Sequence, residues 1–261
     1  MTIQILKDIS LARIVLCVNE AFKDYSVPIS MNEDSFSKFV KRNVVNLSLS
    51  VGAFDGDNLV GFILIGKRGN TIYNSGTAVI PEYRGQGIAT VMLSYIISNI
   101  DKTEIKTFEL EVLQDNEKAI KLYSSFNFSI EEEYSCFIIA SSKSNESLNF
   151  CKCHISQLEA LERDMAFKPS YQNQYLSLIN DSSYSLYQSE ASFIALNDEG
   201  KVASIDANNY FNYKQTIAFA LTRSPKLIFL NQNAKSEFVK KITQEIECKE
   251  FAKQYKMVCT L

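Results

Sequence analysis

The stretch Val79–Ala89 constrains the fold of this chain more than any other part, because it joins a strand to a helix through two glycines. The preceding residues, Thr77–Ile80, are mostly apolar or β-branched and predict a strand that ends at Pro81. From Ile88 onward, apolar residues recur at helical spacing. The stretch therefore predicts a strand, a glycine turn and a helix in direct succession.

The turn between this strand and this helix suits an anionic ligand. Gly85 and Gly87 let the main chain approach a ligand without an intervening Cβ. The first N–H groups of a helix have no partner inside it and lie at the positive end of its dipole. Arg84 adds a positive charge suited to phosphate oxygens. The spacing R-x-x-G-x-A is neither a Walker loop nor a dinucleotide fingerprint. Similar turns occur without a ligand, so whether this turn binds an anion depends on the residues that follow it.

Composition excludes several classes of protein. The 261 residues are 46% apolar, enough for a folded core, and the net charge of −3 gives no general reason to expect a nucleic-acid partner. The six cysteines lack a disulfide framework, and no apolar run approaches the ~20 residues of a membrane span. Cys151–His154 reads C-K-C-H without a matching second pair of ligands, so no metal site is expected. We expect a cytoplasmic protein with no membrane partner.

Glycine usage divides the chain into two parts. Eight of the nine glycines lie at or before Gly87, and the ninth is Gly200. The polar stretch Ser141–Ser147 separates the parts and is typical of a linker. The sequence therefore predicts two domains, residues 1–140 and 150–261, joined by a linker at 141–149.

Periodicity predicts an α+β sheet in the first domain, in the order βααβββαβαβ. The D-G-D-N turn after Phe54 is the strongest hairpin signal in the chain. The expected elements are the strand Ile3–Leu6, helices Ser10–Phe22 and Asn32–Val40, strands Ser48–Phe54, Asn58–Ile65 and Thr71–Ile80, a helix from Ile88 to about Ile100, the strand Lys106–Leu113, the helix Asn116–Phe126 and the strand Ile130–Ile139.

The second half is expected to contain a helix, a hairpin, a helix, a strand, a helix and two strands. Its hairpin signal is N-D-E-G-K, which contains Gly200. The expected elements are the helix Tyr171–Leu186, strands Ser192–Leu196 and Val202–Asp206, the helix Tyr213–Leu221, the strand Lys226–Leu230, the helix Ala234–Ile242, and a closing strand pair, Ile246–Cys248 with Met257–Leu261.

A second motif follows the glycine turn. From Leu110 to Phe128 the chain fits L-E-V-x-x-x-N-x-x-A-x-x-L-Y-x-x-x-x-F, placed after R-x-x-G-x-A. Two motifs in this order and at this spacing resemble the GNAT family of acyl-CoA-dependent N-acetyltransferases over about residues 1–140. The resemblance implies an α+β fold with a mixed sheet flanked by helices. It also implies acetyl-CoA as the acyl donor and an amine as the acceptor.

The resemblance also assigns roles to residues. The strand before the turn should part from the next parallel strand, so that its backbone pairs with the pantetheine arm. Asn116 would hydrogen-bond the cofactor, and Tyr123 would donate a proton to the departing CoA thiolate. The pantetheine-pairing residues would be Thr77, Ala78 and Val79; the pyrophosphate would be held at the turn by Arg84, Gly85, Gln86, Gly87, Ile88, Ala89 and Thr90.

The base that deprotonates the acceptor amine has two candidates. Glu111 matches the Glu of L-E-V in family members that use one, directly or through a water molecule. Strand alternation places Glu109 on the same face, opposite Phe108, Leu110 and Val112, so Glu109 is a rival. Asn127 stands where the family usually has glycine at a helix end, and asparagine tolerates the left-handed backbone expected there.

The predicted function is transfer of an acetyl group from acetyl-CoA to a primary amine. The alternative is a CoA-binding sensor or interaction protein without turnover. The acceptor stays open among a polyamine, an amino sugar, an antibiotic and a peptide N-terminus, and so does the oligomeric state. The second domain, with no glycine between a strand and a helix, should bind no CoA and wall the acceptor side of the cleft. It is expected to be a degenerate GNAT-like copy or an unrelated α+β lid.

Overall fold

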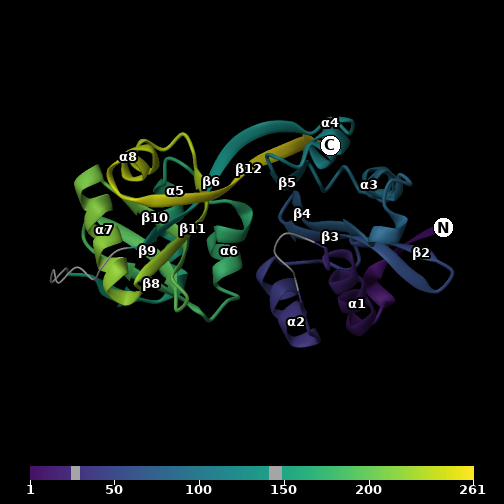
Figure 1. Cartoon of the computed structure of the whole chain (residues 1–261), viewed down its shortest axis with the longest axis horizontal. Helices are drawn as coiled ribbons and strands as arrows, with labels where there is room; N and C mark the ends of the chain where they lie inside the picture. Colours follow the sequence, from purple (N-terminus) through teal and green to yellow (C-terminus); the bar gives the residue numbers. More distant parts are fainter. Residues whose placement is uncertain (25–29, 141–148) are drawn as a thin grey trace. The chain divides into compact units, whose positions relative to one another are not determined.

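Tight turns fold the first part of the chain into an antiparallel meander, as the D-G-D-N signal predicts. The computed structural model describes residues 1–24, 30–140 and 149–261. In it, β1 (Thr2–Ile5) pairs with β2 (Val51–Asp55), β2 with β3 (Asn58–Arg68) and β3 with β4 (Thr71–Val79), all antiparallel (Figure 1).

A crossover helix then brings in a parallel strand. β4 leads through the glycine turn into α3 (Ile88–Asn99), and the chain returns as β5 (Thr107–Leu113), parallel to β4. The remaining elements are α1 (Leu11–Ala21), α2 (Glu33–Arg42), α4 (Glu117–Ser124) and β6 (Ser129–Ala140). The predicted order βααβββαβαβ is thus confirmed, as is the mixed sheet flanked by helices.

Helices cover both faces of this first sheet because its strands alternate. Phe62 and Leu64 of β3 belong to a buried cluster with Ile14 of α1 and Phe36 of α2. The neighbouring Gly61 faces the other way, and a Cβ there would lie 3.3 Å from Cε of Met92 in α3. The buried residues of β3 therefore form two cores, one on each face of the sheet.

Two asparagines fix helix ends as expected. The Asn32 side chain accepts from the Ser35 N–H at 2.8 Å and caps α2. Asn127, after α4, has φ of 64°, the left-handed conformation predicted for it.

The second half contains the expected hairpin, but two of its predicted elements are wrong. Residues Tyr171–Leu186 do not form one helix: α6 (Tyr175–Leu178) is followed by a turn at Asp181 and by β8 (Tyr184–Gln188). The Asp181 carboxylate accepts from the N–H and hydroxyl of Ser183, which ends the helix. The closing strand pair is instead one long strand, β12 (Cys248–Thr260), because no glycine, proline, asparagine or aspartate interrupts it.

Two elements of the second half, β7 and α5, were not predicted, and the others lie near their predicted places. Asn209 caps α7 through its side chain, so this helix begins before the predicted Tyr213. These elements are β7 (Cys151–Cys153), α5 (Leu158–Asp164), β9 (Ser192–Asn197), β10 (Lys201–Ala207), α7 (Tyr210–Arg223), β11 (Lys226–Asn233) and α8 (Glu237–Glu245).

Both halves of the chain use the same succession of elements. Three antiparallel strands, β8, β9 and β10, precede α7, and β11 then runs parallel to β10, as β5 does to β4. The last strands are exchanged: β6 pairs with β11, whereas the end of β12 returns to the first sheet, where the Leu261 N–H donates to the Lys106 carbonyl at 3.0 Å.

This exchange sets the division of the chain into compact units. The first unit comprises Met1–Glu111, Lys118–Ser129 and Met257–Leu261, and the second comprises Val112–Glu117 and Ile130–Lys256. The expected boundaries at residues 140 and 150 therefore need correction. Most of β6 belongs to the second unit, and the end of β12 belongs to the first. Residues 141–148 of the expected linker lie outside the described residues.

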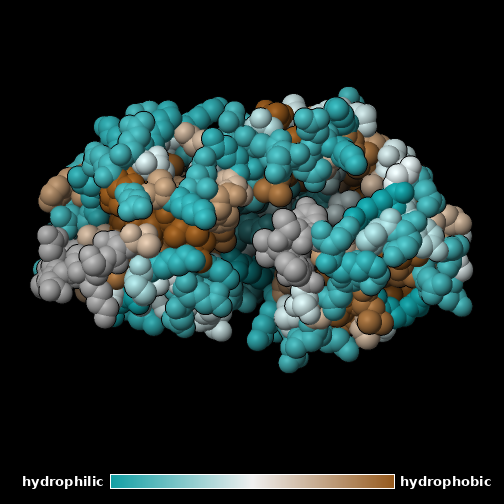
Figure 2. All heavy atoms as spheres, in the orientation of Figure 1, coloured by the Kyte–Doolittle hydropathy of each residue, from teal (hydrophilic) through white to brown (hydrophobic). Residues whose placement is uncertain are grey.

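Hydrophilic side chains cover most of the face shown in Figure 2. Exposed large apolar side chains include Leu16 and Phe211. No helix in the described part of the chain is both long and apolar enough to cross a membrane. The cytoplasmic location stays a prediction.

Candidate active site

The central feature of the first unit is the point where two parallel strands part. The register of β4 with β5 runs from Thr71 opposite Thr107 to Asn74 opposite Leu110 and ends there. β4 has a bulge at Ser75, since Asn74 pairs with Ile65 and Gly76 with Leu64 of β3.

Beyond the bulge, Thr77, Ala78 and Val79 remain paired with β3 on their other side. Their β5 side is past the end of the parallel register. The family resemblance implies a parting of this kind, and the pairing of these three residues with a pantetheine arm stays a prediction.

Asn74 links this parting to Tyr123 of α4. Its Oδ1 accepts from the Gly76 N–H at 3.1 Å, and its Nδ2 donates to the Tyr123 hydroxyl at 3.1 Å. The Thr77 hydroxyl lies 2.8 Å from Nδ2 and 3.1 Å from Oδ1. Because a main-chain N–H can only donate, Gly76 fixes which way the amide points. The Tyr123 oxygen is therefore the acceptor in this bond, and the phenol proton is not used by it.

The ring of Tyr123 is held as firmly as its hydroxyl. The residue is 6% exposed, and its ring centroid lies 5.7 Å from that of Phe128, which in turn packs edge-on against Phe108 at 5.1 Å. The left-handed Asn127 turns the chain back so that the Phe128 N–H donates to the Tyr123 carbonyl at 3.2 Å. Local sequence thus positions the phenol.

Asn74 was not among the residues predicted to belong to the site. Its signal was the run Asn-Ser-Gly inside a strand of β-branched and aromatic residues, which is typical of a bulge.

The glycine turn has the backbone of an anion cradle. Gly85 and Gly87 have φ of 78° and 75°, and a Cβ on either would meet nothing within 4 Å. Gly87 is the N-cap of α3 and supplies no side-chain cap. The Val91 N–H donates to the Gly87 carbonyl, so the N–H groups of Ile88, Ala89 and Thr90 have no partner inside the helix. The turn, including Gln86, is exposed apart from buried Ile88 and half-buried Ala89.

Arg84 has a position that the sequence did not suggest. Its guanidinium donates to both carboxylate oxygens of Asp24, at 2.6 and 2.9 Å, to the Ala21 carbonyl at 2.7 Å and to the Val79 carbonyl at 3.0 Å. These hydrogen bonds from Arg84 hold the pKa of Asp24 below its usual value. Arg84 therefore ties the end of α1 to the end of β4 and fixes the turn; a direct contact to phosphate stays a prediction.

The two candidate bases lie on β5 as expected. Glu109 and Glu111 are half-buried and alternate with the buried Phe108, Leu110 and Val112, so both carboxylates lie on the opposite face. Asn116 stands in the turn before α4, where its N–H donates to the Leu113 carbonyl at 3.1 Å, and it belongs to the second unit.

The first unit fits a CoA ester in three respects. The parted strand offers main-chain groups past the end of its parallel register, and the open turn offers helix N–H groups and space at both glycines. Ser75, at the bulge, has a buried hydroxyl for which the described residues provide no hydrogen-bond partner. A bound ligand would find hydrogen-bond partners at the parted strand and at the glycine turn.

Comparisons with known proteins agree with this assignment. Residues 16–128 match the model of the acetyltransferase (GNAT) family. The chain is 32% identical over 113 residues to N-alpha-acetyltransferase 30 of Schizosaccharomyces pombe, covering 41% of this chain and 71% of the relative. It is 38% identical over 58 residues to the [ribosomal protein bS18]-alanine N-acetyltransferase of Escherichia coli, covering 22% of this chain and 38% of the relative.

Solved structures extend the likeness in fold to the whole chain. A structure from Pyrococcus horikoshii has a TM-score of 0.76 at 12% identity, covering 100% of this chain and 89% of its own. A GCN5-related N-acetyltransferase from Kribbella flavida has a TM-score of 0.66 at 12% identity, covering 99% and 71%. On the family model, the curated relatives and the shared motifs, the chain belongs to the GNAT family of acetyl-CoA-dependent N-acetyltransferases.

Proposed function

We propose that this enzyme transfers the acetyl group of acetyl-CoA to a primary amine by direct attack of the amine on the thioester. The observation that supports it best is the hydrogen bond from Asn74 to Tyr123 at the parting of β4 and β5. It holds a buried phenol, whose oxygen accepts this bond, beside the strand that would carry the thioester.

Tyr123 is the proposed general acid. A phenol has an ordinary pKa near ~10, close enough to that of a thiol for efficient proton transfer to the leaving thiolate. The Asn74 amide donates to the phenol oxygen, so it also stabilises the negative charge that the oxygen acquires as its proton leaves.

Glu111 is the proposed base that removes a proton from the acceptor ammonium, directly or through a water molecule. Glu109 remains the alternative because it shares the same face of β5. An amine must lose its proton to become a nucleophile, so a carboxylate at this edge would raise the reactive fraction at neutral pH.

The main chain of the first unit would hold the acyl donor, which supplies the activated acetyl thioester. Thr77, Ala78 and Val79 would pair with the pantetheine arm as an added strand. The N–H groups from Gly85 to Thr90 would receive the pyrophosphate, and Arg84 would keep that turn in place. Asn116 would add a side-chain hydrogen bond.

We further propose that the second unit is a degenerate copy of the same fold. Its support is the repeated succession of three antiparallel strands, a helix, a parallel strand and a helix. Its expected place as a wall of the acceptor site stays a prediction.

The names of two relatives favour one acceptor class. One is an N-alpha-acetyltransferase and the other a ribosomal-protein alanine N-acetyltransferase, so a peptide α-amine comes first among the four acceptors considered. The test is acetyl-CoA turnover, measured as released thiol, against a peptide with a free N-terminus, spermidine, glucosamine and an aminoglycoside. The same peptide with an acetylated N-terminus is the matched control.

We expect turnover with at least one amine, well above hydrolysis without an acceptor. Preference for the free peptide over its acetylated form would identify the α-amine as the acceptor. Saturable acetyl-CoA binding with no turnover on any amine would contradict the proposal and support a CoA-binding sensor instead.

A further inference from the structure

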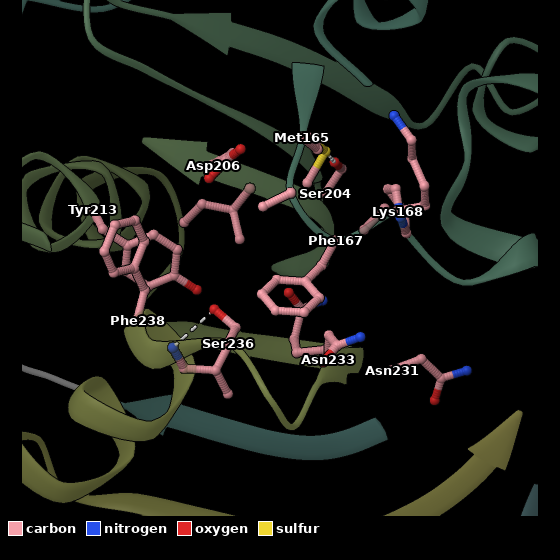
Figure 3. A pocket seen from close by; sticks show the side chains of 16 residues that line it. Met165, Phe167, Lys168, Ser204, Asp206, Tyr213, Asn231, Asn233, Ser236 and Phe238 are labelled. Atoms are coloured by element: carbon pink, nitrogen blue, oxygen red, sulfur yellow. Dashed lines mark hydrogen bonds between the residues drawn. The ribbon is translucent and has the colours of Figure 1, made fainter. Parts of the chain in front are cut away.

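The second unit contains a pocket at its own parting of parallel strands. The register of β10 with β11 ends at Val202 opposite Phe229, and β10 has a bulge at Ala203 against β9. A cavity of about 60 Å³ begins there, lined by β10, β11, the starts of α7 and α8 and the segment Met165–Pro169 (Figure 3). Parted parallel strands are a common place for ligands, so this cavity is a candidate site.

Tyr213 presents an unpartnered hydroxyl to this cavity. The residue is 2% exposed, and no described residue forms a hydrogen bond with its buried hydroxyl. Figure 3 shows the phenol directed from α7 into the pocket. A buried hydroxyl without a partner destabilises the folded chain, and a polar ligand atom would remove that cost.

Asp206 supplies a negative charge to the same cavity. Its carboxylate is half-buried and accepts from the Ala207 N–H at 2.9 Å, and burial raises its pKa. Lys168, the cation in the lining, does not neutralise it: its ammonium donates to the carbonyls of Glu162 and Arg163, and Figure 3 shows it directed away from the pocket. A desolvated carboxylate of this kind favours a cationic ligand.

The remaining walls combine amides and apolar groups. Asn231 and Asn233 of β11 also line the cavity, but their side-chain oxygens already accept hydrogen bonds, from the Cys136 thiol at 3.1 Å and from the Lys235 N–H at 2.9 Å. Phe167 and Phe238 contribute aromatic rings, which attract cations and pack against alkyl chains. An ammonium group has three N–H donors, which suits a carboxylate and a phenol oxygen together.

We propose that this pocket binds a small aliphatic primary ammonium compound. A cavity of about 60 Å³ has room for roughly four to six water molecules, which corresponds to a ligand of about five non-hydrogen atoms. The proposed site is distinct from an acetyl-CoA site, because the start of α7 has no glycine turn and the Asn209 side chain caps one of its N–H groups. It does not depend on the proposed reaction.

The test is calorimetric titration of the full chain, without acetyl-CoA, with n-butylammonium and with n-butanol as the neutral control of similar size. We expect n-butylammonium to bind saturably and at least about tenfold more tightly than n-butanol, because hydrogen bonds to charged groups are the stronger ones. Equal binding of the two compounds, or no binding of n-butylammonium, would overturn the proposal.

Variants assign the binding to this pocket. Asp206→Asn and Tyr213→Phe should each weaken n-butylammonium binding, the first by about tenfold or more. Tyr210→Phe, one turn earlier on α7 and outside the lining, should bind as the wild type does. Glu111→Gln should also retain binding, which separates this site from the acceptor site of the first unit.

Tyr213→Phe also separates a ligand site from a structural role. Without ligand, this variant should melt at the same temperature as the wild type or higher, because it removes an unpartnered buried hydroxyl. A lower melting temperature with unchanged n-butylammonium affinity would assign the hydroxyl to folding and contradict the proposal. If Asp206→Asn does not fold, the comparison of the two ligands on the wild type and on Tyr213→Phe still decides.

Discussion

The parallel pairs β4–β5 and β10–β11 resemble each other in their strands and differ in the helix that follows the leading strand. In both, a bulge in the leading strand, at Ser75 of β4 and at Ala203 of β10, stands where pairing with the next parallel strand stops. The helices that follow differ at their first residue. α3 begins after Gly87, which has no side chain, whereas α7 begins after Asn209, whose Oδ1 accepts from the Asn212 N–H at 2.9 Å.

This difference shows how one residue before a helix decides whether the first N–H groups of the helix stay open to an anion. The N–H groups at a helix start attract anions only while they lack other partners. In α7, the Asn209 side chain already satisfies one of these N–H groups and stabilises the helix by about 1 kcal/mol. In α3, left-handed glycines leave the N–H groups open. A single capping side chain thus stabilises the start of α7, whereas its absence leaves the N–H groups at the start of α3 open to a ligand.

The largest expected effect is that of Tyr123→Phe, which tests whether acetyl transfer takes place where β4 and β5 part. It removes the proposed proton donor, so kcat should fall by ~10²–10⁴-fold while acetyl-CoA affinity stays the same. Tyr210→Phe, which removes a buried hydroxyl in the second unit, should leave kcat unchanged. Steady-state kinetics and calorimetry measure the two quantities; normal kcat in a folded Tyr123→Phe protein would disprove the role.

The next effect concerns the base on β5. Glu111→Gln should lower kcat/KM by about 10²-fold at neutral pH and approach the wild type as pH rises, because more acceptor is then already a free amine. Glu109→Gln is the matched control on the same strand face and should change the rate little. The pH profiles of both variants decide, and the reverse pattern would transfer the role to Glu109.

Asn74 offers a test of which way the hydrogen bond to Tyr123 runs. Asn74→Asp keeps the shape and still accepts from the Gly76 N–H, but it forces the Tyr123 hydroxyl to donate to a carboxylate. We expect a loss in kcat of about ten- to a hundredfold in Asn74→Asp, and a smaller one in Asn74→Ala. A merely structural role would give the opposite order, since aspartate fills the site and alanine does not. KM for acetyl-CoA is measured alongside and should change little.

The smallest effect distinguishes the two helix starts. Gly87→Ala should weaken acetyl-CoA binding by about tenfold, since a side chain enters the cradle where a charged ligand is hydrogen-bonded. It should also cost roughly 1–2 kcal/mol of stability, because alanine resists a φ of 75°. Gly56→Ala, at a left-handed glycine in a hairpin, controls for this strain and should bind acetyl-CoA normally.

Asn209→Ala completes this comparison. It should cost about 1 kcal/mol of stability and leave acetyl-CoA affinity unchanged, with one binding site per chain by calorimetry. A second equivalent site, or equal loss of affinity in Asn209→Ala, would mean that the two helix starts do not differ as described.

Most of the first sheet and part of the site could be predicted from the sequence, because their signals are local. Hairpin turns, helix caps and strand alternation involve residues a few positions apart, and the order βααβββαβαβ follows from them. The two motifs likewise located the glycine turn, Tyr123 and the two glutamates of β5. Asn127 was expected to be left-handed from its place at a helix end, and it is.

Local sequence signals gave wrong predictions where a segment pairs with residues far away in the sequence. The run Tyr171–Leu186 has helical spacing, but the turn at Asp181 converts its end into a strand that pairs with β9. The domain boundaries failed for a related reason, since nothing in the sequence of β6 or β12 shows which sheet each will complete.

The sequence by itself determined the elements of residues 1–140, the open helix start at Gly87 and the phenol that chemistry would use. Only the tertiary structure decided what those groups contact: Asn74 donates to Tyr123 across 49 residues, and Arg84 binds Asp24 across 60. Backbone propensity and helix capping act between near neighbours, so the sequence displays them directly. Side-chain hydrogen bonds between distant residues depend on how sheets and helices bring them together, and here the parting of β4 from β5 placed Asn74 beside Tyr123.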